Sequence, residues 1–235
     1  VFNRGQWFYE AATDFKNIQK RIENLIQLSL NAKQESSKFK KPINYGQHFK
    51  INYQAQRFDK IPQEKKIALI EHYARLQKKM PLACDGRANY KDNYQIKYYK
   101  NSSGTQYIYD NNRGGISLSM TLKENEKTFI DKFGHYSSHF SGLESLDNQI
   151  LNFFKESEKF IHAPTVTPGK YHLVLNPEIV AVFTHESFGH KSEADFLLGD
   201  ENALKEWPLG FKIGSDVLSI VDDGTLERTS GYCPF

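Results

Sequence analysis

Apolar residues recur at the helical period in three parts of the chain, and this pattern predicts three amphipathic helices. The first helix follows an N-cap at Thr13 or Asp14 and runs to about residue 34. The second starts at residues 61–62, where a proline occupies the first turn, and ends before Pro81. The third covers residues 145–161. We expect the first two helices to be scaffold and not to belong to a site.

Between residues 88 and 138 the pattern changes to short β-rich runs separated by turn residues. The Gly114-Gly115 pair predicts a turn, because no helix opening with Lys-Ser/Thr follows to make it a phosphate loop. We expect an antiparallel meander with short connections. Its predicted strands are residues 94–99, 106–109, 116–122 and 128–135.

The segment Tyr171–Leu175 predicts a buried strand, and Asn176-Pro177 predicts the cap and first turn of one more helix. The fold class that follows is α+β. We expect an antiparallel β meander with packed helices, followed by a strand leading into a His-Glu-x-x-x-His helix.

The candidate chemistry lies on that last helix, where an apolar run ends in His185, Glu186, Gly189 and His190. Neutral imidazole is a good ligand for a borderline cation such as zinc. A carboxylate beside a metal-bound water can take the proton that the metal makes acidic. The commoner His-Glu-x-x-His helix uses this chemistry with two histidines four residues apart on one face.

The two histidines of this chain are five residues apart, which an ideal α-helix does not bring together. Five residues turn through roughly 500°, so the two side chains would lie about 140° apart. A local π-type turn would return them to register, and Gly189 most readily allows the backbone to bend. The hypothesis is a metal-binding helix with a widened turn. The alternative, that His185 and His190 are ordinary surface residues, stays open.

Acidic residues follow the second histidine, among them Glu193 and Asp195. Carboxylates near a metal helix can orient the imidazole ligands from a second layer. They can equally form a solvated face, and spacing alone does not separate the two interpretations.

Composition narrows the function classes. The 235 residues carry 25% charged and 39% hydrophobic residues with a net charge of +3, which is typical of a globular protein and lacks the dense basic patch of a nucleic-acid surface. No apolar run of about 18 residues predicts a membrane span, and no signal peptide is visible. Two cysteines, Cys84 and Cys233, make no disulfide framework and fit a reducing compartment. Because the chain starts with Val and ends at Cys233-Pro-Phe without an obvious stop, we expect both ends to be cut.

Three motifs in order resemble the TldD/PmbA family of metallopeptidases. Residues 185–190 match its His-Glu-x-x-Gly-His motif, residues 193–196 match the end of its Gly-Leu-Glu-Gly-Asp-Phe motif, and residues 221–225 match its Val-Asp-Asp-Gly-Thr turn. The early stretch 5–12 also resembles the end of the family's N-terminal region. The resemblance covers most of the chain, with specific motifs only in the C-terminal third.

This resemblance implies a zinc peptidase in which His185 and His190 are metal ligands and Glu186 is the catalytic base. The family's third ligand is a Cys in its C-terminal half, which we expect outside this chain, since Cys233 lies too early. Family members form paired subunits in the cytoplasm, and the histidine motif makes this chain similar to the active subunit. A homodimer or a heterodimer with a related subunit is therefore expected.

The resemblance also implies extended or unfolded peptides as substrates, with leader-peptide processing as one activity. Lys191, Ser192 and Ala194 stand where the family has Gly, Leu and Gly. We expect residues 1–82 to be the helical part of an N-terminal domain. Residues 83–235 would be a β-rich region with the metal-motif helix, the start of a catalytic domain that continues beyond the chain end. With two histidines alone we expect weak metal binding and no cleavage. The competing hypothesis is a non-catalytic partner or binding subunit of the same fold.

Overall fold

The computed structural model describes residues 1–33, 44–53, 55–193, 196–197, 201–226 and 232–233. These residues form two compact units. One unit contains residues 1–52 and 95–110, and the other contains residues 53–94 and 111–235. The domain boundary expected at residue 82 stays a prediction. None of the described helices combines the length and the hydrophobicity that crossing a bilayer requires.

The first unit holds a small hairpin and the first predicted helix. Strands β1 (Phe2–Asn3) and β2 (Gln6–Trp7) pair antiparallel, and helix α1 spans Ile18–Leu30. The helix begins later than predicted because Asn17 has a left-handed backbone, with φ of 56°. Strand β3 (Gln47–Lys50) lies in a segment for which the sequence pattern gave no element, and it pairs parallel with the start of β5.

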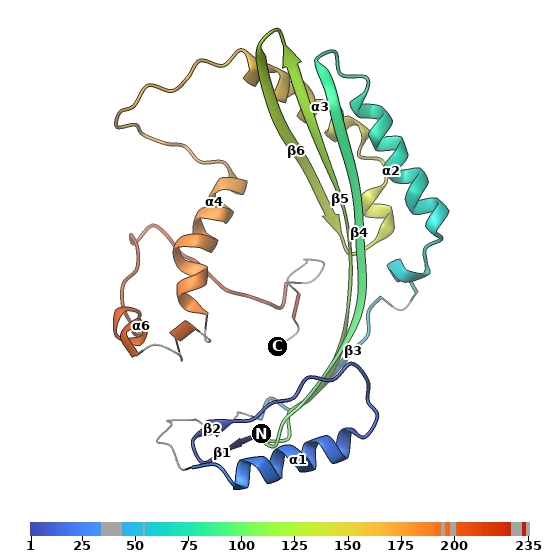
Figure 1. The fold of residues 1–235 in the computed structure, drawn as a ribbon. Coiled ribbons are helices and arrows are strands. Elements are labelled where there is room, and N and C mark those ends of the chain that lie inside the picture. The colour runs from blue at the N-terminus through green and yellow to red at the C-terminus, as the bar shows by residue number, and fades with distance from the viewer. Residues whose placement is uncertain (34–43, 54, 194–195, 198–200, 227–231, 234–235) are drawn as a thin grey trace. The chain divides into compact units, whose positions relative to one another are not determined.

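A sheet of long strands dominates the chain (Figure 1). Strand β4 spans Ala83–Lys100, β5 spans Gln106–Glu124 and β6 spans Lys127–Ser137. Strand β5 is hydrogen-bonded to both of the others and pairs antiparallel with β6. The short segments between consecutive strands confirm the predicted meander.

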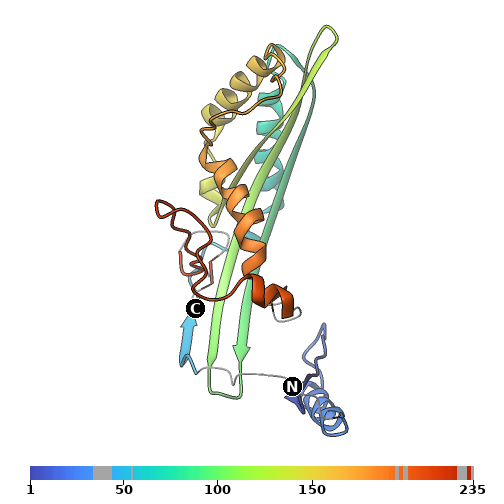
Figure 2. The same cartoon turned by 90° about the vertical axis from the view of Figure 1, so that its left-hand side faces the viewer.

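Two helices cover one face of this sheet. Helices α2 (Gln63–Gln77) and α3 (Asp147–Ile161) lie on the same side of the strands in both views (Figures 1 and 2). Every second residue of β5 from 116 to 122 is buried beneath them, while the residues between are partly exposed. The Tyr73 hydroxyl of α2 donates to the Leu143 carbonyl over 2.6 Å and accepts from the Leu146 backbone N–H over 3.2 Å, so it connects α2 to the residues that lead into α3. The buried core comprises Tyr73, Leu76, Met80, Ile116, Leu118, Met120, Leu122, Phe133, Leu146, Ile150, Phe154 and Ile161.

The turn predicted at Gly114-Gly115 is wrong, because both residues lie inside β5. Gly114 and Gly115 are needed there for their small size. A Cβ atom on Gly114 would lie 2.3 Å from the Phe58 ring, and one on Gly115 would lie 2.4 Å from the Tyr136 ring. The glycine pair therefore lets one strand pass between two aromatic side chains that belong to other segments.

The predicted strand over Tyr171–Leu175 is not formed. The segment has no regular structure, and its side chains are exposed, Val174 completely so. A strand needs a neighbour for its backbone hydrogen bonds, and no described segment pairs with this one. The α+β class, the meander with packed helices and the helix that carries the histidine motif are confirmed.

Candidate metal centre

The helix that carries the histidines begins where the sequence predicted. Helix α4 spans Pro177–Thr184, with Asn176 as its N-cap. The Asn176 side chain accepts a hydrogen bond from the Ile179 backbone over 2.9 Å, and Pro177 occupies the first turn, where its missing N–H costs nothing. None of the residues of α4 is buried against the described part of the chain, so the cap stabilises the first turn without help from packing.

The helix widens into a π-helical turn at the motif itself. The turn, η3, spans His185–Gly189, and the His190 backbone N–H donates to the His185 carbonyl five residues earlier. This i→i+5 bond is the feature that the spacing of the two histidines predicted. Gly189 keeps an ordinary helical backbone, with φ of −58° and ψ of −59°. A Cβ on Gly189 would come no closer than 3.7 Å to His185, so the turn does not depend on the conformational freedom of glycine.

The widened turn brings three potential ligands together. The imidazole rings of His185 and His190 have centroids 4.4 Å apart. One ligand atom from each of His185, Glu186 and His190 lies within 4.8 Å of the other two. Two imidazole nitrogens and a carboxylate oxygen are a donor set that zinc takes. The residues present therefore fit a zinc ion, and their roles as ligands and base stay predictions.

The Glu193 side chain contacts the imidazole ring of the second histidine, His190. The carboxylate oxygen Oε1 of Glu193 lies 2.5 Å from Nδ1 of His190, and Nε2 of the same ring lies 3.8 Å from Oε2 of Glu186. A hydrogen bond from Nδ1–H to Glu193 leaves Nε2 as the lone-pair nitrogen directed at the shared site. Of the two acidic residues proposed as a second layer, Glu193 thus lies within hydrogen-bond distance of an imidazole nitrogen. Asp195 lies outside the described residues.

Within the described ranges, the three motif residues are the one group of three or more His, Cys, Asp or Glu side chains close enough to hold an ion. Cys233 does not join it. Its backbone N–H donates to the Gly224 carbonyl, in the Asp-Asp-Gly-Thr turn that the sequence predicted. In that turn Asp223 accepts hydrogen bonds from both the backbone and the hydroxyl of Thr225, and these bonds lower the pKa of the Asp223 carboxyl.

Sequence reasoning missed an apolar hollow of about 420 Å³ that starts at His190. Its walls include Phe196, Trp207 and Phe211, and Trp207 follows helix α6 (Glu201–Glu206). The indole N–H of Trp207 donates to the Ser192 hydroxyl over 3.1 Å. No periodic pattern marks these aromatic residues, because they lie in short segments joined by irregular chain.

Two family profiles match this chain. The family profile described as the PmbA/TldA metallopeptidase central domain matches residues 56–158. The profile described as the PmbA/TldA metallopeptidase C-terminal domain matches residues 168–235, which include the histidine motif. No solved structure was found to match the chain.

Curated relatives are named metalloproteases. A metalloprotease of Methanocaldococcus jannaschii is 27% identical over 72% of this chain and 37% of its own length. A metalloprotease of Synechocystis sp. is 25% identical over 94% of this chain and 48% of its own. A zinc metalloprotease TldD homolog of Saccharolobus solfataricus is 30% identical over 55% of this chain and 31% of its own. The chain therefore spans between about a third and a half of the length of these relatives.

Proposed function

Because this chain belongs to the PmbA/TldD metallopeptidase family, we propose that it carries the zinc-binding and catalytic helix of a peptidase. The observation that carries the proposal is the π-helical turn, which brings His185, Glu186 and His190 within 4.8 Å of one another. An ordinary helix would separate the two imidazoles. The name of the relative in Saccharolobus solfataricus supports zinc as the metal.

His185 and His190 would hold the ion, and a third protein ligand would complete the site, as catalytic zinc sites require. When bound, zinc supplies Lewis-acid polarisation of the scissile carbonyl and lowers the pKa of water. Glu186 would accept a proton from a water molecule at the site and return it to the leaving amine. Glu193, which contacts Nδ1 of His190, would hold that ring in the tautomer and orientation that metal binding needs.

The substrates in this proposal are extended or unfolded peptides, and leader-peptide processing is one form of that activity. Strand addition to a sheet edge is a general way to hold an extended peptide. The hollow formed by Phe196, Trp207 and Phe211 would take a hydrophobic side chain of the peptide, since it starts at His190 and its walls are aromatic. A dimer with a second copy or a related subunit in the cytoplasm is part of the same proposal.

The test is Glu186→Gln in the full-length protein. We expect the variant to keep its bound zinc, measured by elemental analysis, and to lose peptide hydrolysis by at least two orders of magnitude. The control is Glu178→Gln, which changes a carboxylate in the first turn of α4 and should leave both properties intact. If hydrolysis survives in the Glu186 variant, the assigned base is wrong.

The same experiment separates the peptidase from a non-catalytic binding subunit. A binding subunit would bind peptides equally well before and after the substitution and would show no turnover in either form. For the 235-residue chain by itself we expect weak zinc binding and no cleavage, because two histidines supply fewer ligands than a catalytic site uses. Full activity of this chain would show that the third ligand lies within it.

A further inference from the structure

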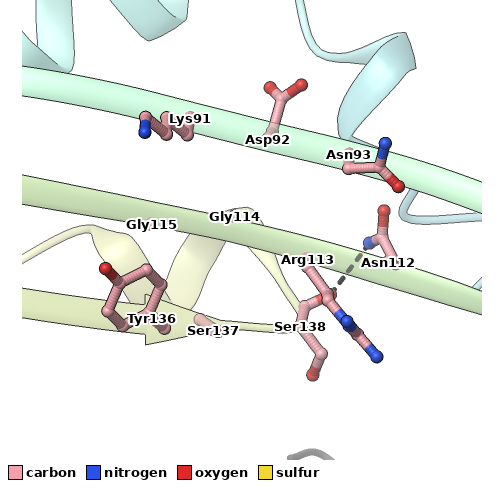
Figure 3. Close-up of a pocket in the computed structure, with 10 residues that line it drawn as sticks. All are labelled: Lys91, Asp92, Asn93, Asn112, Arg113, Gly114, Gly115, Tyr136, Ser137 and Ser138. Carbon is pink, nitrogen blue, oxygen red and sulfur yellow. Dashed lines mark hydrogen bonds between the residues drawn. The ribbon is translucent and has the colours of Figure 1, made fainter. Parts of the chain in front are cut away.

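A second hollow, of about 630 Å³, lies against the sheet and shares no residue with the metal centre. It is lined by consecutive residues of β4 and β5 and by the end of β6, all within the second compact unit (Figure 3). The function proposed above does not use it.

The floor of the hollow is backbone and an aromatic ring. Tyr136 pairs with Gly115 in the register of β5 and β6, and its ring lies so close to Gly115 that a Cβ there would be 2.4 Å away. The other face of the Tyr136 side chain is free to meet a ligand, since 70% of the residue is exposed. The exposed ring therefore offers an aromatic surface that a ligand in the hollow can contact.

The rim beside Ser138 is held rigidly by one buried amide. Asn112 is 2% exposed. Its side chain accepts from the Phe58 backbone N–H over 2.9 Å and donates to the carbonyls of Gln56 and Ser138 over 2.8 Å each. Figure 3 shows the bond to Ser138 crossing from β5 to the segment after β6. With three bonds satisfied inside the protein, Asn112 fixes the wall and does not itself recognise a ligand.

The charge of the hollow is positive. Lys91 and Arg113 are both exposed, and neither forms an ion pair with a described residue. The negative charge of Asp92, the carboxylate that lines the hollow, is already paired. Lys66 lies 2.5 Å from it and forms an ion pair, and the Tyr90 hydroxyl donates to it over 2.7 Å. Two cations therefore remain without a counter-charge in the described part of the chain.

We propose that this hollow binds the carboxylate of a peptide. The planar guanidinium of Arg113 matches a carboxylate with two parallel hydrogen bonds, whereas Lys91, from which the Arg113 side chain points away in Figure 3, adds positive charge to the hollow without sharing that contact. Tyr136 and Gly115 supply a flat surface for the chain that carries the carboxylate. The carboxylate comes from the C-terminus of the peptide or from an Asp or Glu side chain, and the chemistry of recognition is the same for both.

The test is fluorescence anisotropy with a labelled peptide of about eight residues in the presence of a metal chelator, so that its outcome does not depend on the metal centre. The peptide is compared with its C-terminal amide and with a version in which Glu is replaced by Gln. We expect one of these two neutralisations to weaken binding about tenfold, the size of one lost charge-assisted hydrogen bond, and thereby to identify the source.

Arg113→Gln should weaken binding of the acidic peptide by a similar factor and should abolish its preference over the neutral peptide. Arg87→Gln is the matched control, because Arg87 is an exposed arginine of β4 that does not line the hollow. Circular dichroism before and after heating checks that both variants fold. The proposal is overturned if both neutral peptides bind as tightly as the acidic one, or if Arg113→Gln and Arg87→Gln behave alike. Inorganic phosphate that competes better than acetate would also overturn the carboxylate assignment.

Discussion

Glu193 offers a direct test of how the proposed metal centre is held, because among the described residues its side chain contacts only His190, one of the two expected ligands. Its carboxylate lies 2.5 Å from Nδ1 of His190, whereas the Glu186 carboxylate lies 3.8 Å from Nε2 of the same ring. Glu193→Ala removes the acceptor, so the ring is free to rotate and to carry its proton on either nitrogen. Zinc affinity should fall as a result.

The expected loss is between about tenfold and a hundredfold in the zinc dissociation constant, the range found when the partner of a metal-bound imidazole is removed. This corresponds to about 1.4 to 2.7 kcal/mol. Glu193→Gln should lie between the wild type and the alanine variant, since its amide oxygen still accepts a hydrogen bond but carries no charge.

The assay is competition between the full-length protein and a chromophoric zinc chelator at constant pH and ionic strength. Glu178→Ala is the control, and we expect its affinity to stay within twofold of the wild type. Two results would refute the reasoning. An unchanged affinity in Glu193→Ala would show that the contact does not orient His190. A loss beyond a thousandfold would show that Glu193 is itself a ligand.

Three further predictions concern the scaffold. Gly114→Ala should destabilise the protein by about 1–3 kcal/mol in urea unfolding, because the new methyl group would lie 2.3 Å from the Phe58 ring. The control is Gly134→Ala, whose methyl group would lie 3.8 Å from its nearest neighbour and which should cost less than 1 kcal/mol. Asn112→Ala should cost about 3 kcal/mol or more, since it leaves three backbone groups without partners; a loss below 1 kcal/mol would contradict this role. Burial raises the pKa of the Tyr73 hydroxyl, so the stability that this group contributes is present below pH 10 and declines at higher pH. Tyr73→Phe removes the titrating group. The fall of the unfolding free energy at alkaline pH should therefore be shallower in the variant by up to about 1.4 kcal/mol per pH unit.

The sequence predicted the helices of the core and the widened turn for physical reasons that are local. Apolar residues at helical period predicted α2 and α3, because each helix buries one face against the sheet. The π-helical turn followed from a five-residue spacing that only a widened helix can use. Both inferences needed nothing beyond a single segment and the geometry of the backbone.

The features that could not be predicted depend on contacts between distant segments. The Gly114-Gly115 pair has the local signature of a turn, and its actual role appears only when Phe58 and Tyr136 are placed on either side of β5. The apolar run at residues 171–175 has the local signature of a strand, but pairing decides whether a strand forms. The hollow beside His190 is lined by aromatic residues from separate segments, and their spacing in the sequence follows no helical or strand period.

The most direct test of the central claim is zinc X-ray absorption spectroscopy on the zinc-loaded protein and on its His190→Gln variant. We predict two imidazole nitrogens at about 2.0–2.1 Å in the wild type and one in the variant, since His185 and His190 should bind the same ion across the π-helical turn. A spectrum with fewer than two imidazoles in the wild type, or one that His190→Gln leaves unchanged, would contradict the account.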